Sequence, residues 1–405
     1  EEFLEYEVSK LMQSLSKPDR PRVGLMSSLK MTGDIDMQTF QQTPGWVIAD
    51  QLGQQFEVVP IEQTATEIPK DVDVLVIVHP KAWSPETRLA VDQFAMGGGR
   101  ILAFVDPVAE VDRGDSRNPM MPAPGGQGSD MAQLLASWGV ALREGKIVGD
   151  SEIALQVNGG QGGRPVRHFA ILGFGPQNLS RADVVTSSLE SVNASSVGIL
   201  DPLPGATTTL VPLIQSSEYA MPLDAMQLQF MGDPEELQRG FRPTGERFTI
   251  AARISGEAKS AFPVDAEGGA GGDSRIKRTD HLNVIVVADT DMLTDRMWVQ
   301  VRSFFGQQVA SPWANNGDFV VNSVDNLLGS AALISVRSRG RFTRPFDVVQ
   351  SLRREAEASY LESANDLQAQ LAETERKLSD LQQERKEKNV LSLSPEQEAA
   401  VEQFQ

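Results

Sequence analysis

The chain has 405 residues, enough for two or three domains, and 40% of them are hydrophobic, enough for a buried core. Its 55 acidic side chains outnumber 37 basic ones, so the formal charge is −18. Because phosphate backbones and anionic lipids attract clustered lysine and arginine, this balance excludes a general nucleic-acid binder and disfavours charge-driven docking on lipid. Cysteine is absent, which excludes disulfides, thiolate nucleophiles and cysteine-based zinc sites.

Both ends of the sequence carry helical patterns. Residues 1–17 repeat apolar side chains at helical spacing, and residues 395–405 do the same at the other end. No stretch approaches the roughly 20 apolar residues that span a bilayer. The sequence starts without Met, so we expect a soluble region excised or processed from a longer polypeptide.

Strands and helices alternate over residues 18–145. Apolar and β-branched runs predict strands at 22–28, 56–61, 73–78 and 100–106. Helical patterns predict helices at 46–52, 84–97 and 131–138. The second of these has Ser84 as a candidate N-cap, followed by Pro85. The run at 73–78 is typical of a parallel strand that is buried on both faces. We therefore predict an α/β fold with a doubly wound, mostly parallel sheet.

The pattern changes twice after residue 145. Short β-like runs broken by turn residues fill residues 146–262, which we predict as a β-rich insertion or second domain. Residues 263–345 return to the α/β pattern with a strand at 282–288 and helices at about 292–306 and 319–328. We expect this segment to complete the first sheet. The proline- and glycine-rich residues 107–129 predict a long exposed loop.

Residues 346–405 form a separate C-terminal helical segment in this interpretation. Glycine and proline are absent from 346–388, and Ala364, Leu371 and Leu378 recur at heptad spacing. Thr374 interrupts this heptad pattern of apolar residues. We expect a coiled-coil-like helix that forms an αα-hairpin or a stalk, or that packs on a partner.

Candidate ligand-binding residues lie where the predicted strands end. A doubly wound sheet binds ligands outside the carboxyl ends of its strands. Ser28, His79 and Asp106 follow three of these strands and define a candidate cleft, which the 107–129 loop would cover. No glycine-rich phosphate-binding motif follows any of them, so no nucleotide cofactor is expected.

His79 follows the central strand, where several α/β hydrolases hold their nucleophile. That geometry needs a free backbone N–H directly after the nucleophile to bind the oxyanion. The next residue here is Pro80, which has no N–H. The sequence therefore favours a histidine that bonds to a neighbouring loop over a catalytic group.

Asp289 and Asp291 follow the strand at 282–288 and could chelate a hard cation. Alternatively, Asp291 caps a helix that begins near Met292, and Asp289 stabilises the same turn. Two carboxylates without a third ligand make a poor cage, so capping is favoured. A divergent hydrolase or metal-dependent enzyme using these two residues and His281 stays open as an alternative.

Two charged or polar surfaces are candidate interaction faces. Asp318, Asn322 and Asp325 lie together on the helix predicted at 319–328. They form either a solvated face or a polar surface that is buried against the chain or a partner. The second surface is a basic strip with the residues Arg337, Arg339 and Arg341. This strip lacks interleaved aromatic residues, which favours salt bridges within or between subunits over binding of nucleic acid.

Four segments carry a resemblance to a known family: 21–29, 71–80, 95–107 with its Gly-Gly-Gly and Phe-Val-Asp-Pro, and 316–329. Their sequences and their order resemble the auxiliary component of uncharacterised ABC transporters, a family that includes the gliding-motility GldG-like proteins. The resemblance covers about residues 5–345. It implies an α/β domain similar to class I glutamine amidotransferases and to intraflagellar-transport proteins. It transfers no catalytic residues.

The resemblance also implies a location and partners. Such proteins look like a large region on the periplasmic face of the inner membrane, held between membrane helices beside an ABC permease and its ATPase. We expect a non-catalytic subunit that acts by protein–protein interaction, with no cofactor, and the sequence leaves open whether it forms an oligomer. A solute-binding module that presents a ligand to the permease is the second hypothesis, and the enzyme above is the third.

Overall fold

The computed structural model describes residues 20–35, 42–112, 127–158, 165–230, 235–262, 275–304 and 307–329. It also describes residues 370, 373, 374, 376 and 377, which are helical. The chain divides into two units, Glu1–Phe342 and Thr343–Gln405. The first unit holds the sheet and the helices that are discussed below.

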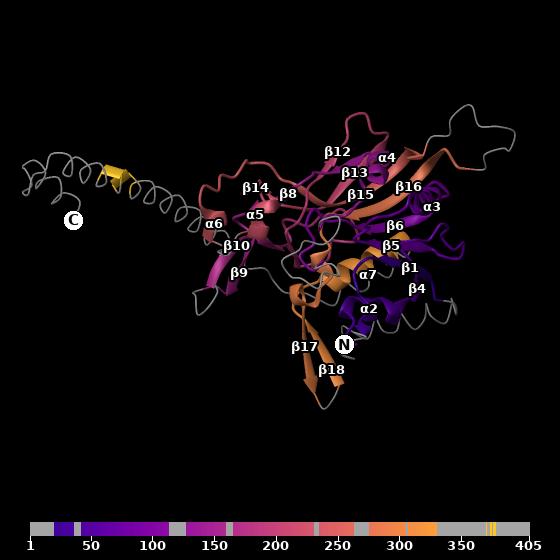
Figure 1. Cartoon of the computed structure of the whole chain (residues 1–405), viewed down its shortest axis with the longest axis horizontal. Coiled ribbons are helices and arrows are strands. Elements are labelled where there is room, and N and C mark those ends of the chain that lie inside the picture. The colour runs from indigo at the N-terminus through magenta and orange to yellow at the C-terminus, as the bar shows by residue number, and fades with distance from the viewer. Residues whose placement is uncertain are drawn as a thin grey trace, which may run out of the picture. The chain divides into compact units, whose positions relative to one another are not determined.

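A seven-stranded sheet organises the first unit, with the strand order β13-β15-β16-β6-β5-β1-β4 (Figure 1). The strands are β1 Arg22–Ser27, β4 Glu57–Pro60, β5 Val74–Val78, β6 Arg100–Phe104, β13 Thr208–Gln215, β15 Thr249–Lys259 and β16 Arg278–Val287. The five strands from β16 to β4 are parallel, whereas β15 pairs antiparallel with both β16 and β13. The predicted α/β class is confirmed, and the sheet is mixed, with four parallel and two antiparallel strand pairs.

Helices are fewer and shorter than a doubly wound fold predicts. They are α2 Val47–Gln55, α3 Pro85–Met96, α4 Ala132–Ser137, α5 Ala225–Phe230, α6 Glu235–Gln238 and α7 Asn316–Leu327, with 3-10 turns η1 Asp291–Leu293 and η2 Asp295–Met297. Helix α3 begins as predicted, because Ser84 Oγ accepts a hydrogen bond from the Thr87 N–H and Pro85 occupies the first turn. None of the helices in the described part of the chain has the length and apolar character needed to cross a bilayer.

The remaining strands form small sheets. A three-stranded sheet contains β11 Val192–Ser195, β10 Pro165–Phe174 and β9 Ala154–Asn158. The two-stranded sheets pair β12 Leu200–Pro202 with β7 Val140–Leu142, β14 Ala220–Asp224 with β8 Lys146–Asp150, β17 Val299–Phe304 with β18 Gln307–Pro312, and β2 Asp34–Ile35 with β3 Gln42–Thr43.

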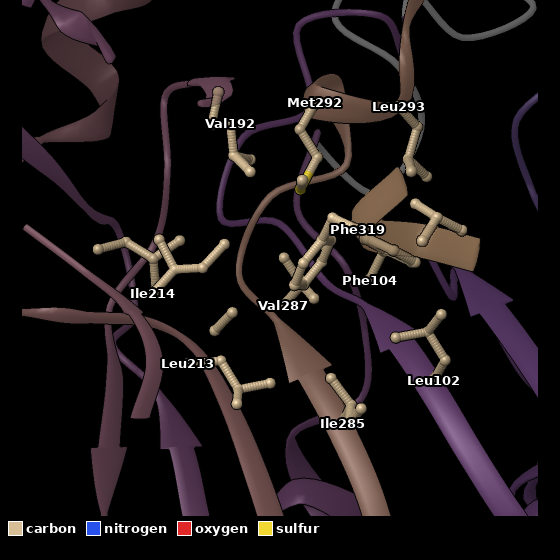
Figure 2. Close-up of a cluster of buried hydrophobic side chains, with 14 of the residues drawn as sticks. Leu102, Phe104, Val192, Leu213, Ile214, Ile285, Val287, Met292, Leu293 and Phe319 are labelled. Atoms are coloured by element: carbon tan, nitrogen blue, oxygen red, sulfur yellow. The ribbon is translucent and has the colours of Figure 1, made fainter. Parts of the chain in front are cut away.

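The core lies on both faces of the sheet. Strand β5 shows why its sequence is an unbroken apolar run: Val74, Val76 and Val78 belong to one buried cluster, and Leu75 and Ile77 to the other. Helices α2 and α7 pack in the first cluster, and α3 and α4 pack in the second. Figure 2 shows part of the first cluster, where Phe319 of α7 lies among the side chains of β6 and β16.

The region from 146 to 262 is rich in strands, as predicted. It does not stand apart from the first sheet, however, because β13 and β15 extend that sheet beyond β16. The boundaries predicted at 145 and 262 therefore differ from the boundaries of the sheet. The bounds of a second domain stay a prediction.

The helix predicted at about 292–306 is wrong. Residues 291–297 form the two 3-10 turns, and residues 299–304 and 307–312 pair as the strands β17 and β18. The spacing of Leu293, Met297 and Val301 fits a helix, but Val299 and Val301 also fit the period of a strand. The predictions for 1–17, for the heptad residues 364, 371 and 378 and for most of the 107–129 loop concern residues outside the described ones.

Candidate functional site

The polar residues predicted at the strand ends meet at the carboxyl edge of the parallel strands. Ser28 follows β1, His79 follows β5, Asp106 lies two residues after β6, and Asp289 lies two residues after β16. These strands are neighbours and run parallel, so their ends share one edge. Ser28 is exposed, whereas the side chains of His79, Asp106 and Asp289 are fully buried.

His79 holds the centre of this edge in a strained backbone. Its φ of 51° lies in the left-handed region that non-glycine residues rarely occupy. The Ser28 hydroxyl donates a hydrogen bond to the His79 carbonyl oxygen at 2.5 Å. The ring contacts Ser129 Oγ through Nδ1 at 2.9 Å and Asp112 Oδ2 through Nε2 at 3.2 Å.

The hydrogen bonds fix the direction of each donor in this chain of groups. The Asp106 N–H donates to Ser129 Oγ at 2.9 Å. The Asp112 carboxylate, which Lys81 also contacts, can only accept, so the neutral imidazole carries its proton on Nε2 and donates it to Asp112. Nδ1 is then an acceptor, and the Ser129 hydroxyl donates to it. Burial lowers the pKa of His79 more than Asp112 raises it, so the imidazole is neutral at pH 7.

Ser129, His79 and Asp112 have the residue types and the contacts of a hydrolytic triad. A triad also needs backbone N–H groups that are free to bind an oxyanion. The Ser129 N–H donates to the Asp106 carbonyl at 2.8 Å, and the Asp130 N–H donates to the Pro80 carbonyl at 2.7 Å. With both donors engaged and the imidazole fully buried, the three residues hold the loop at 127–130 against the sheet edge.

Three carboxyl groups gather beside this chain of hydrogen bonds. Oxygens of Asp106, Asp289 and Asp291 lie within 4.8 Å of one another, and all three residues are fully buried. The sequence named Asp289 and Asp291 as a candidate cation pair, with capping favoured, but missed that Asp106 is their third neighbour. Strand order could have indicated it, since β6 and β16 are adjacent.

All six oxygens of these carboxyl groups accept backbone hydrogen bonds. Asp106 accepts from the N–H groups of Val108 at 2.9 Å and Thr290 at 2.8 Å. Asp289 accepts from the N–H groups of Ser195, Asp291 and Met292. Asp291 accepts from the N–H groups of Glu110 at 2.8 Å and Val111 at 3.1 Å. The cluster therefore ties three loops together.

The pKa of each of these three carboxyl groups is raised above its ordinary value. Burial is the main cause for each, because it disfavours the charged form. The charge of Asp291 adds to the rise at Asp106, and that of Asp106 adds to the rise at Asp289. The pKa of Asp291 is raised to about 7. Protons therefore neutralise much of the cluster near neutral pH, as in other carboxyl groups forced together.

Glu110 is a residue that the sequence did not single out. Its carboxylate accepts hydrogen bonds from the hydroxyls of Ser195 and Ser196 at 2.5 Å each and from Arg296 Nη2 at 2.8 Å. Burial raises the pKa of Glu110, but these bonds outweigh it, and the pKa lies below its ordinary value. Ser196 has a φ of 52°, a second strained position at this edge. Nothing local in the sequence connects Glu110 with serines 85 residues away.

The capping prediction is partly correct. Asp289 stabilises the turn, because its Oδ1 accepts the N–H groups of Asp291 and Met292. The residue that precedes the 3-10 turn η1 is Thr290 rather than Asp291. His281 is exposed near the start of β16, eight residues before Asp289. At about 3.3 Å per residue in a strand, this separation is roughly 26 Å, so His281 does not join the carboxyl cluster.

The polar face predicted on the helix α7 is largely internal. Asn322 is 2% exposed and Asp325 is 4% exposed, and Asn322 donates to the Val185 carbonyl at 3.2 Å. Asp318 is half-buried and accepts a hydrogen bond from Asn315 at 2.8 Å. Of the two readings left open by the sequence, the structure supports a polar surface buried against the chain itself, which corrects the prediction of an interaction face. Arg337, Arg339 and Arg341 lie outside the described residues.

A surface groove of about 710 Å³ lies at the opposite edge of the sheet. The loop before β5 and helix α3 with its C-terminal glycines form its walls. Lys70, Asp73 and Arg100 supply charged groups, and Ile68 and Phe94 supply apolar surface. At the predicted cleft, His79 and Asp106 are buried and hydrogen-bonded within the chain, and ligand binding there stays a prediction.

The chain is a mixed α/β protein, and the buried polar residues at the carboxyl edge of its parallel strands form hydrogen bonds mainly within the chain. The family described as ABC-type uncharacterized transport system matches residues 20–323. The match covers about three quarters of the chain, which therefore belongs to this family, as its resemblance implied. No curated protein matches the sequence.

Three solved structures resemble the chain at low similarity. The N-terminal domain of mmIFT52 is 10% identical, with a TM-score of 0.38 over 76% of this chain and 97% of that one. A putative ThuA-like protein from Bacteroides uniformis is 10% identical, with a TM-score of 0.33 over 76% and 91%. A β-galactosidase from Bacillus circulans sp. alkalophilus is 12% identical, with a TM-score of 0.25 over 69% and 43%. All three TM-scores are below 0.5, so these likenesses have no bearing on function.

Proposed function

We propose that this chain is a non-catalytic auxiliary subunit of its ABC-type transport system and acts through contacts with a permease and an ATPase. One observation carries the proposal. At the edge where an α/β protein normally binds its ligand, all six oxygens of Asp106, Asp289 and Asp291 accept hydrogen bonds from the chain's own backbone. Groups used in this way brace loops, and their full burial keeps a substrate from reaching them.

The neighbouring serine and histidine support the same proposal. His79 is fully buried, so a substrate does not reach its ring. The N–H groups of Ser129 and Asp130 donate to carbonyls of the chain instead of facing an open oxyanion site. A hydrolase would need both groups released from these bonds.

The proposal places the chain on the periplasmic face of the inner membrane, anchored by segments outside this sequence. Its basis is the resemblance to auxiliary proteins whose large region lies between membrane helices. The C-terminal segment 346–405 would then connect the α/β unit with the membrane or the permease. A link to gliding motility stays a prediction from the same resemblance. Protease added to spheroplasts should digest the chain, and full protection from external protease would contradict this location.

Co-purification tests the partner assignment. The full-length protein, tagged and solubilised from its native membranes, should retain a permease and an ATPase encoded in the same transport system. The amounts, measured by quantitative mass spectrometry, should be equimolar. An unrelated tagged membrane protein from the same cells is the control. Recovery of the chain without either component, in a detergent that keeps the permease bound to its ATPase, would contradict the proposal.

A solute-binding module is the second candidate, and the groove beside α3 favours it. Its volume of about 710 Å³ is within the range of small-molecule sites. A panel of metabolites should then contain a compound that raises the melting temperature. The substitution Ala90→Trp, which fills the groove, should abolish that rise, whereas Ala141→Trp outside the groove should not. A panel without any effect would remove this candidate.

A further inference from the structure

The groove beside α3 lies where β5 and β6 begin (Figure 1). Part of its wall is apolar: Ile68 is 7% exposed and Val72 is 6% exposed. Leu89 and Phe94 of α3 are half-buried and add to the same wall. A cavity of about 710 Å³ with an apolar wall has the size and lining of a small-molecule site. The wall therefore favours a ligand with an apolar part.

The glycines after α3 shape this wall. A Cβ at Gly99 would lie 2.5 Å from Cε1 of Phe94, so the aromatic ring lies directly against the glycine backbone. Gly98, with a φ of 88°, turns the chain from α3 into β6. The run of three glycines in the sequence therefore leaves room for an aromatic ring along the groove.

Four charged side chains line the same groove, two of each sign: Glu67, Asp73, Lys70 and Arg100. Among the described residues, the side chains of Glu67, Lys70 and Arg100 form no hydrogen bond and no ion pair. Asp73 accepts the Arg22 N–H at 2.9 Å through one oxygen only. The groove therefore carries charges of both signs that the described part of the chain does not neutralise.

Uncharged polar side chains contribute little to this lining, in which they are Thr66 and Gln93. The amide of Gln93 is occupied by Ile276, whose N–H donates to Oε1 at 2.7 Å and whose carbonyl accepts from Nε2 at 3.0 Å. The groove offers charges rather than neutral hydrogen-bonding groups, and this favours a charged solute over a neutral one.

We propose that the groove beside α3 binds an apolar amino acid or a short peptide with an apolar side chain. The shared chemistry is a carboxylate, an ammonium group and an apolar side chain. Lys70 and Arg100 attract the carboxylate, and Glu67 and Asp73 attract the ammonium group. Phe94 contacts the apolar side chain. A ligand with one charge would meet two like charges, so the balance of signs favours a zwitterion. This inference rests on the solute-binding candidate above and specifies its solute.

Isothermal titration calorimetry on the full 405-residue chain tests the proposal. At least one of L-phenylalanine and the dipeptide leucyl-phenylalanine should bind, and the tighter of the two identifies the free amino acid or the peptide as the source. Phenylacetate lacks the ammonium group and phenethylamine lacks the carboxylate. Each should bind roughly ten-fold more weakly or worse, because it leaves one pair of charged side chains without a partner.

Substitutions at exposed positions connect the binding with the groove. Lys70→Gln and Glu67→Gln should each weaken it by roughly three-fold or more. Lys259→Gln removes an exposed charge outside the groove and should leave it unchanged. Absence of binding by both zwitterions, equal binding of the two single-charge analogues, or equal effects of Lys70→Gln and Lys259→Gln would overturn the proposal.

Failure of this proposal is distinguishable from failure of the solute-binding candidate. If another metabolite bound and Ala90→Trp abolished its binding, the candidate would stand, whereas the zwitterionic ligand would be excluded. None of these measurements uses a permease, so the result is also independent of the partner assignment.

Discussion

Asp291 stabilises the fold through its hydrogen bonds, and ionisation of its buried carboxyl group destabilises the fold. Its two oxygens accept the N–H groups of Glu110 and Val111, which fixes the loop after β6 against the turn after β16. Burial and the nearby charge of Glu110 raise the pKa of Asp291 to about 7. The hydrogen bonds hold the loops, while ionisation of the cluster opposes folding.

The stability of the chain should therefore depend on pH through Asp291. Its pKa is about 7 in the folded chain against an ordinary value of 3.8, so its contribution is largest below pH 4 and is lost as pH rises to 7. The loss is at most about 1.4 kcal/mol per pH unit. In urea titrations from pH 4 to 8, Asp291→Asn should lose less stability with rising pH than the wild-type chain.

Asp280→Asn is the control for this measurement. Asp280 is exposed, and a hydrogen bond from Arg278 lowers its pKa, so its removal should not reduce the loss of stability toward pH 7. Parallel curves for the wild-type chain and Asp291→Asn would show that the buried carboxyl group does not titrate in this range.

Ser129 is expected to act as a brace. Ser129→Ala removes the acceptor of the Asp106 N–H and the donor to His79, which leaves buried polar groups without partners. This should lower the free energy of unfolding by about 1–3 kcal/mol in urea denaturation. Ser151→Ala, which removes a hydrogen bond of an exposed hydroxyl to the Tyr219 carbonyl, should cost clearly less. Equal effects of the two substitutions would remove the bracing role.

The sequence predicted some of these residues and missed their connections. Strand ends are readable from hydrophobic runs, so Ser28, His79, Asp106 and Asp289 were found. The partner of His79 was expected only as a neighbouring loop, and Ser129 lies 50 residues further along the chain. Glu110 and its serines were missed because folding brings together residues that carry no common local pattern.

At the scale of elements, capping and turn residues made α3 predictable. Glycine substitutions test this account of the helices. Gly98 ends this helix region with a φ of 88°, which a side chain disfavours, whereas Gly53 lies within α2 with open space around a Cβ. Gly98→Ala should lower the free energy of unfolding by about 1 kcal/mol, and Gly53→Ala should raise it by about 0.5–1 kcal/mol. Thermal unfolding measures both, and the same sign for the two substitutions would contradict this account.

The hairpin of β17 and β18 shows where element prediction fails. Apolar residues at 293, 297 and 301 fit a helical period, and a short stretch does not distinguish that period from the strand period of Val299 and Val301. The structure ends the helical part at Met297 and pairs the following residues with 307–312. Pairing with the next strand along the chain decided the element, since the apolar residues alone fit both periods.

At the scale of the whole molecule, the parallel half of the sheet was predictable and the antiparallel half was not. Strands β1, β5 and β6 alternate with helices, which predicts parallel neighbours. Strands β13 and β15 lie in a region without helical alternation, and their attachment to β16 depends on pairings that the sequence does not signal. The family match at 20–323 includes both halves.

The central claim is that this subunit acts by contact and performs no chemistry. Its most direct test is complementation of a strain that lacks the gene, with a full-length chain carrying Ser129→Ala at a temperature where the variant stays folded. The account predicts wild-type transport with the variant present in membranes at the wild-type amount. Loss of transport by a folded, membrane-assembled Ser129→Ala chain would contradict it.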